Sequence, residues 1–100
     1  MDIVEWRKQI DELDRRIVDL INQRGHAAQE IGRLKRNSDL PIVEPNREQK
    51  IFENVRKYNQ GPLQDSDLEM IYEKLIDVMR ALQKEEILQG RSPEGKDQSK

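Results

Sequence analysis

The sequence contains no cysteine and a single histidine, and these gaps exclude several kinds of chemistry. Without cysteine the chain has no disulfide, no thiolate nucleophile and no cysteine-based metal site. No Ser-His-Asp or Cys-His arrangement is available, no cluster of residues has the spacing of metal ligands, and no glycine-rich phosphate-binding loop occurs. The chain therefore offers no obvious nucleophile, metal site or nucleotide site.

Aromatic residues are equally scarce, at 4% of the chain, so the core is expected to be aliphatic. Glycine and proline number only five and four, while Glu, Lys, Arg, Leu and Ile are abundant, which favours helices. The formal net charge of −2 argues against nucleic acid as the partner. No window is long and apolar enough to span a membrane, and the N-terminus lacks the apolar stretch of a signal peptide, so we expect a soluble, cytoplasmic protein.

Apolar residues recur at near-heptad spacing through the first third of the chain, residues 2–36. The residues with this spacing are Ile3, Trp6, Ile10, Leu13, Ile17, Leu20, Ala27, Ile31 and Leu34. A helix of this length measures ~50 Å, and a domain of 100 residues cannot cover it from end to end. A partner chain is the natural cover.

Two interruptions divide the remainder into a short and a medium helix. Residues 37–46 contain two prolines that prevent the first helix from continuing, and a second helix is predicted over residues 45–57. A Gly-Pro pair marks the second interruption. Ser66 and Glu69 then form a capping-box pattern that predicts the start of a third helix, which ends near Leu88.

The organisation is one helical domain followed by a tail. Residues 1–88 are expected to form an all-α domain with a long, a short and a medium helix. Residues 89–100 are polar and poor in apolar side chains, so we expect a disordered tail or the remnant of a linker.

Arg24 occupies a position of the first helix where the spacing requires an apolar side chain. Burying an unpaired guanidinium is costly, so Arg24 either reaches water along the helix, pairs with a carboxylate of a partner helix, or sets the register of a helix pair. A binding role is the alternative, because Lys35 lies only ~20° around the helix and ~16 Å along it. Ala28, Ile31 and Gly32 lie on the same face between the two cations. Small residues flanked by two long cations describe a hollow for a small molecule with two negative groups.

Four more polar residues stand out on the expected helices. Arg47 lies in the first turn of the second helix, where free amides favour an anion, although a surface charge is the simpler explanation. Glu48 beside it suits a helix N-terminus for the same electrostatic reason. Gln83 falls on an apolar line of the third helix and is either a core amide bonded to the backbone or a donor aimed into a pocket. Arg7 lies ~100° around and ~25 Å from Arg24, so it is either an exposed charge or part of a hollow in a partner chain.

The order and spacing of these residues resemble the all-helical chorismate mutases. The matching residues are Arg7, Arg24, Lys35, Pro41, Arg47, Glu48 and Gln83, within a resemblance that spans about residues 3–87. The resemblance implies an intertwined homodimer of three-helix chains, in which the long helices pair and Arg7 reaches the active site of the other subunit. The chain also looks like the mutase domains fused to DAHP synthase, which makes association with such a synthase an expectation.

The activity implied by the resemblance is that of an isomerase, which converts chorismate to prephenate in the shikimate pathway of aromatic amino acid biosynthesis. This intramolecular Claisen rearrangement uses no cofactor and no metal. The implied catalytic residues are Lys35, Gln83, Arg24 and Glu48. The implied substrate-binding residues are Arg7 of the partner subunit, Arg24, Lys35, Glu44, Arg47, Glu48, Met79 and Gln83.

The implied roles follow the charges of the substrate and of the transition state. The arginines hold the two carboxylates of the substrate. Lys35 and Gln83 donate to the ether oxygen, where negative charge grows as the C–O bond breaks. Glu48 holds the ring hydroxyl, with help from the backbone near Glu44.

One residue departs from the family pattern. Four positions before Gln83, many members carry a small hydroxyl residue that contacts a substrate carboxylate, and here that residue is Met79. One contact to the substrate is therefore expected to be weaker, while the cationic clamp is retained.

Other functions compete with this interpretation. An isochorismate-pyruvate lyase of the same fold would share the cations, but Glu48 beside Arg47 favours the mutase, because that acid reads the substrate hydroxyl and tends to be replaced in the lyases. A non-catalytic regulatory or sensor domain that binds a dianion of the shikimate pathway is a second alternative. A plain structural coiled coil is a third.

Overall fold

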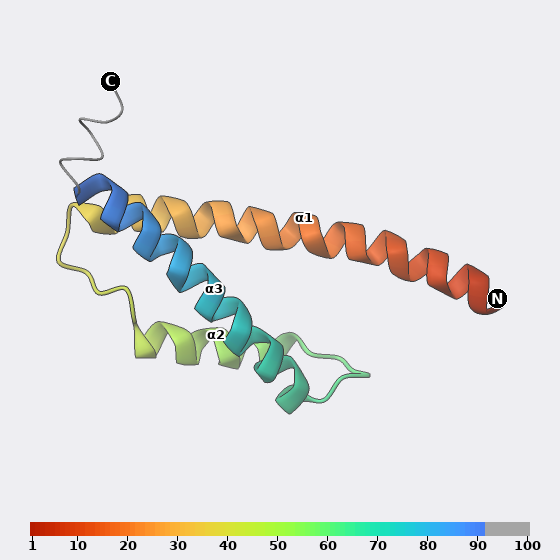
Figure 1. Cartoon of the computed structure of the whole chain (residues 1–100). Helices are drawn as coiled ribbons and strands as arrows, with labels where there is room; N and C mark the ends of the chain where they lie inside the picture. The colour runs from red at the N-terminus through yellow and green to blue at the C-terminus, as the bar shows by residue number, and fades with distance from the viewer. Residues whose placement is uncertain (92–100) are drawn as a thin grey trace, which may run out of the picture.

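Three helices account for most of residues 1–91, the part of the chain that the computed structural model describes (Figure 1). They are α1 (Ile3–Arg36), α2 (Pro45–Tyr58) and α3 (Asp65–Arg91). No strand occurs within these residues. The expected all-α arrangement of a long, a short and a medium helix is therefore confirmed.

Local features explain where the first two helices begin. At the start of α1, the carboxylate of Asp2 accepts from the backbone N–H of Glu5 at 2.9 Å, and Glu5 Oε1 accepts from the N–H of Asp2 at 3.2 Å. This reciprocal capping box satisfies two amides at the helix start. At the start of α2, Pro45 occupies the first helical position, where its fixed φ fits and no amide proton is required.

The start of α3 differs from the expectation. The helix begins at Asp65, two positions earlier than a cap at Ser66 would allow, because the carbonyl of Gln64 accepts from N–H groups of the first turn. The capping box expected at Ser66 is therefore wrong. The carboxylate of Glu69 instead pairs with Arg56 of α2 at 3.1 Å and helps to hold the two helices together.

The end of α3 differs too, since the helix continues past Leu88 to Arg91. Its last turns are tied to α1, where the guanidinium of Arg36 donates to the carbonyl of Glu86 at 2.6 and 3.1 Å. Residues 89–91 therefore belong to the helix rather than to the expected tail. The remainder of that tail, residues 92–100, lies outside the described residues.

Helix α3 packs against the C-terminal half of α1 and against α2 (Figure 1). The closest approach is at Gly32 of α1, where a Cβ would lie 2.9 Å from the carbonyl oxygen of Gln83 and 3.0 Å from its Cα. Two backbones this close leave room only for glycine, which explains why a glycine occurs inside this long helix. The buried apolar side chains are Ala28, Ile76, Met79 and Ile87. The core of the single chain is therefore small and aliphatic.

The N-terminal half of α1 extends beyond the other two helices (Figure 1). Six large residues on it share the expected spacing and form what we call the apolar stripe: Ile3, Trp6, Ile10, Leu13, Ile17 and Leu20. They are 46% to 66% exposed, so one chain leaves the whole stripe in contact with water. A continuous apolar surface of this kind marks an interaction site. None of the helices in residues 1–91 combines the length and the apolar character that crossing a membrane requires.

Candidate active site

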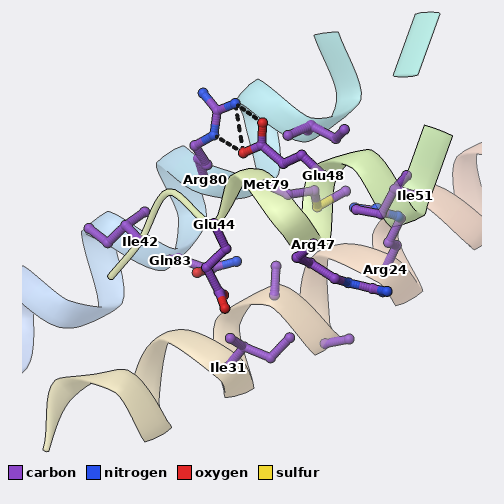
Figure 2. Close-up of a pocket in the computed structure, with 13 residues that line it drawn as sticks. Arg24, Ile31, Ile42, Glu44, Arg47, Glu48, Ile51, Met79, Arg80 and Gln83 are labelled. Carbon is purple, nitrogen blue, oxygen red and sulfur yellow. Dashed lines mark hydrogen bonds and ion pairs between the residues drawn. The ribbon is translucent and has the colours of Figure 1, made fainter. Parts of the chain in front are cut away.

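A cavity of about 310 Å³ opens between the three helices and the connection from α1 to α2 (Figure 2). We call it the central pocket. Its apolar wall consists of Ala27, Ala28, Ile31, Ile42, Ile51, Ile76 and Met79. Its polar groups are Arg24, Glu44, Arg47, Glu48, Arg80 and Gln83. An apolar wall with a few converging charged groups is typical of a small-molecule site.

Helical spacing explains why these side chains converge. On α1, Arg24, Ala28 and Ile31 are separated by four and three residues, so they share one face. On α3, Met79 and Gln83 are four residues apart and face the same space. Part of the hollow expected on α1 is therefore present, since Arg24, Ala28 and Ile31 line the pocket. Gly32 instead packs against the backbone of α3, and Lys35 is not among the lining residues.

Arg24 of α1 and Arg47 of α2 bring two guanidinium groups to the central pocket (Figure 2). Both also border a second hollow of about 560 Å³, next to α2 and the start of α3, so they stand where the two spaces meet. Within residues 1–91 neither of them pairs with a carboxylate, unlike Lys35 and Arg80. Two cations without a counter-charge are equipped to bind an anion bidentately.

Lys35 lies next to the wall of the central pocket rather than in it. Its side chain is only 3% exposed, and its ammonium donates to Glu44 Oε2 at 2.8 Å and to Gln83 Oε1 at 3.0 Å. A buried ammonium requires such partners, because an unpaired one would lose its hydration without compensation. Lys35 is therefore held beside the pocket by two residues that line it.

The bond from Lys35 determines which atom of the Gln83 amide remains available to a ligand. Its amide oxygen already accepts from Lys35, so its amide nitrogen is the group that remains to donate. Of the two alternatives for Gln83, the geometry favours a pocket donor over a core amide bonded to the backbone. An ammonium and an amide donor placed together can stabilise negative charge that develops on a nearby oxygen.

Glu48 of α2 and Arg80 of α3 form a two-pronged ion pair in the pocket wall (Figure 2). Arg80 Nε donates to Glu48 Oε2 at 2.9 Å, and Arg80 Nη2 donates to Glu48 Oε1 at 3.0 Å. We call this pair the Arg80–Glu48 fork. Arg80 Nη2 also lies 2.9 Å from Glu48 Oε2, and contacts to both oxygens fix the orientation of the carboxylate as well as its position.

Arg80 is the pocket residue that the sequence analysis missed. A signal for it existed, because Arg80 lies four residues after Ile76 and three before Gln83 and so shares the pocket face of α3. A search for polar residues on strictly apolar lines overlooks a cation that lies beside such a line. Its partner Glu48, 32 positions earlier in the chain, gives no local sign of the pairing.

The remaining expected site residues lie in different places. Arg7 is on the exposed N-terminal half of α1 and does not line the pocket of its own chain. Met79 is buried and lines the pocket, so a thioether stands where the resemblance leads us to expect a hydroxyl. Glu44 contributes its carboxylate to Lys35, whereas only its backbone was expected to take part.

Three helices thus surround a pocket whose charged groups are three arginines and two glutamates, with apolar side chains between them. This arrangement is typical of a helical protein with a site for a small charged molecule. A family model described as "Chorismate mutase type II" matches residues 6–84. The chain belongs to this family, whose defining activity is that of an isomerase. The resemblance seen in the sequence is therefore confirmed.

Individual relatives agree with the family assignment. The chorismate mutase of Methanocaldococcus jannaschii is 34% identical over 84 residues, which cover 83% of this chain and 85% of that protein. A bifunctional chorismate mutase/prephenate dehydratase of Aquifex aeolicus is 36% identical over 87 residues, 83% of this chain and 24% of that protein. The solved structure of a chorismate mutase from Thermus thermophilus matches with a TM-score of 0.80 and 30% identity, over 82% of this chain and 93% of that chain.

The lengths of these relatives differ widely. The chain spans 24% of the Aquifex aeolicus protein and 26% of a similar bifunctional protein of Stutzerimonas stutzeri, against 85% of the archaeal mutase. In both bifunctional proteins the second activity is that of prephenate dehydratase. The expected link to DAHP synthase finds no support in these relatives.

Proposed function

We propose that this chain is a chorismate mutase that rearranges chorismate to prephenate in the shikimate pathway of aromatic amino acid biosynthesis. The observation that carries the proposal is the central pocket in a member of this family. Its two arginines have no carboxylate partner within residues 1–91, and the buried Lys35 is bonded to the half-buried Gln83. The reaction is unimolecular, so it requires a shape and a charge distribution rather than a nucleophile.

The first source of rate is confinement of the substrate. Chorismate is a flexible dianion whose reactive conformer is folded. We assign its carboxylates to Arg24 and to Arg7 of the partner subunit, with Arg47 supporting the negative charge nearby. Holding the dianion in the folded form removes the entropy cost of reaching it in solution. Because Arg24 and Arg47 have no carboxylate partner within residues 1–91, binding breaks no ion pair of theirs.

The second source of rate is charge that is already in place for the transition state. As the C–O bond breaks, negative charge grows on the ether oxygen. We assign Lys35 and Gln83 as its donors, since the ammonium and the amide are bonded to each other at 3.0 Å and so act at one place. A fixed donor of this kind contributes roughly a hundredfold to a thousandfold to turnover. Glu48 accepts from the ring hydroxyl.

We also propose that two copies of the chain form an intertwined homodimer. The apolar stripe supports this, because one chain leaves it exposed and a second long helix of the same kind would cover it. The second hollow supports it too, because it is bordered by Arg24 and Arg47 and gives Arg7 of the partner subunit a route to the substrate. Each dimer would then contain two sites.

The direct test is to incubate the purified chain with chorismate and follow the loss of chorismate and the formation of prephenate. Turnover with prephenate as the product is expected. Binding of chorismate without turnover would favour the regulatory or sensor domain. A parallel assay with isochorismate separates the mutase from the lyase, because salicylate formation as fast as prephenate formation would contradict our assignment.

Mixed dimers test the shared site. Arg7→Ala and Arg24→Ala homodimers are each expected to be inactive, because every site lacks one carboxylate anchor. In a mixed dimer one site lacks both arginines and the other keeps both, so a mixture of the two variants regains turnover at about one site per mixed dimer. A mixture that stays inactive after subunit exchange would place Arg7 outside the site.

Two further expectations belong to the same proposal. A location in the cytoplasm is consistent with a metabolic enzyme of this pathway. Association with DAHP synthase rests only on the resemblance. Two measurements test it: whether a DAHP synthase changes the kcat of the mutase when added, and whether the two proteins co-elute in gel filtration. Unchanged kinetics and separate elution would remove that partner.

A further inference from the structure

Arg80 has no role among those that the resemblance assigns, yet it is bonded to the acid expected to read the substrate hydroxyl. We propose that Arg80 is a positioning residue that locks Glu48 in one orientation and so makes the central pocket specific for a dianion with a hydroxyl at one place on its ring. This inference rests on the proposed function and adds a determinant of specificity to it.

The geometry of the fork carries the first step. A carboxylate has about four lone-pair directions, and Arg80 uses one on each oxygen of Glu48, at 2.9 and 3.0 Å. Both oxygens keep a further direction with which to accept from a ligand. Because the bidentate contact fixes the plane of the carboxylate, those directions are fixed as well. A hydroxyl elsewhere on the ring would not meet them.

A second carboxylate holds Arg80 in the Arg80–Glu48 fork in place. The third nitrogen of the Arg80 guanidinium, Nη1, donates to Asp77 Oδ1 at 3.0 Å, one turn earlier on α3. The guanidinium is thus held by a carboxylate from each of two helices. Without Arg80, Glu48 would be a flexible side chain on a partly open wall, and ordering it on binding would cost conformational entropy.

Arg80 also neutralises the charge of Glu48. A pocket for a dianion that also contains two carboxylates would repel its ligand. Each carboxylate has its own cation: Glu44 is bonded to Lys35, and Glu48 to Arg80. Arg24 and Arg47 are left to attract the ligand.

A purely structural role is the competing explanation, since the fork also joins α2 to α3. The chain offers a matched control in Arg56 of α2, which pairs with Glu69 of α3 at 3.1 Å. This second ion pair joins the same two helices but does not line the central pocket. If helix docking were the whole role of Arg80, removing Arg56 would have a similar effect.

The experiment compares two substrates, chorismate and an analogue that lacks the ring hydroxyl. We expect Arg80→Gln to lower kcat/KM for chorismate by about 10- to 100-fold, the range for a hydrogen bond to a charged group, and for the analogue by less than about threefold. In a Glu48→Gln background, Arg80→Gln should add less than about threefold, although this double variant keeps the net charge of the wild-type pair. Arg80→Lys keeps the charge without the fork and should fall between Arg80→Gln and the wild type. Arg56→Gln should match the wild type on both substrates.

Each contrary outcome has its own meaning. Equal losses on both substrates, multiplied losses in the double variant, or wild-type discrimination in Arg80→Lys would each overturn the positioning role. If Arg80→Gln does not fold, Arg80→Lys carries the same comparison. A wild-type chain without turnover contradicts the proposed function and this inference with it. A wild-type chain that turns over, beside an Arg80→Gln variant with unchanged kinetics, contradicts this inference alone.

Discussion

Arg24, Arg47 and Lys35 carry the same charge but stand in different surroundings. The two arginines have no carboxylate partner within residues 1–91, whereas Lys35 is buried between Glu44 and Gln83. The sequence located these cations because a charge on an apolar helix face is visible from spacing alone. It did not give their pairing, because Lys35 and Gln83 are 48 positions apart. The sequence therefore predicted several residues that line the pocket, among them Arg24, Arg47 and Gln83, but it missed Arg80 and gave none of the bonds.

At this scale we predict that Lys35→Ala lowers kcat by roughly 100- to 1,000-fold. The fold should suffer far less, by about 1–3 kcal/mol in the free energy of unfolding, because Glu44 is 41% exposed and can return to water when its partner is lost. Steady-state kinetics and thermal unfolding of the same preparation separate the two effects. Wild-type turnover in this variant would exclude Lys35 from the reaction.

At the scale of the element, periodicity and turn residues predicted three helices and most of their ends. Both ends of α3 differed from the prediction. At its start, several polar residues could cap a helix, and the carbonyl of Gln64 together with the bond between Asn59 and Asp65 at 2.7 Å selects the earlier start. Such a choice depends on contacts between the loop and the helix. Local sequence does not contain them.

Two glycines of α1 test how closely the helices pack. A Cβ at Gly32 would meet the backbone of α3 at 2.9 Å, so Gly32→Ala must separate the helices and should cost about 1–3 kcal/mol despite the better helix propensity of alanine. A Cβ at Gly25 would meet only the end of the Leu82 side chain, at 3.3 Å. The free energy of unfolding of Gly25→Ala should therefore lie within about 0.5 kcal/mol of the wild-type value or above it, since alanine favours the helix. Chemical denaturation of both variants measures the difference, and equal effects would mean that the contact at Gly32 is not tight.

At the scale of the whole molecule, a single chain is incomplete. The apolar stripe accounts for most of the large apolar residues in the first 20 positions, and nothing within residues 1–91 covers it. Its existence followed directly from the sequence. The identity of its cover did not, because the spacing that buries a stripe against a second copy would also bury it against a different helix.

The stripe yields a prediction about assembly. Ile17→Asp places a charge in the middle of the stripe and should convert the dimer to monomers, with loss of activity, because a buried unpaired carboxylate is costly. Asn22→Asp makes the same change in charge on the exposed side of the same helix and should leave the mass unchanged. Light scattering coupled to gel filtration distinguishes them. A dimer that survives Ile17→Asp would rule out the stripe as the interface.

The unbroken course of α1 has a consequence for how this protein can vary. One helix connects the stripe at its N-terminal end to the pocket face at its C-terminal end, with no loop between them to absorb a change of length. Inserting or deleting one residue near its middle would turn one end relative to the other by ~100° and move it by ~1.5 Å. Side chains along α1 can therefore be exchanged with some freedom, but the number of residues between its two ends must stay constant. Natural variation in length should be confined to the two connections between helices.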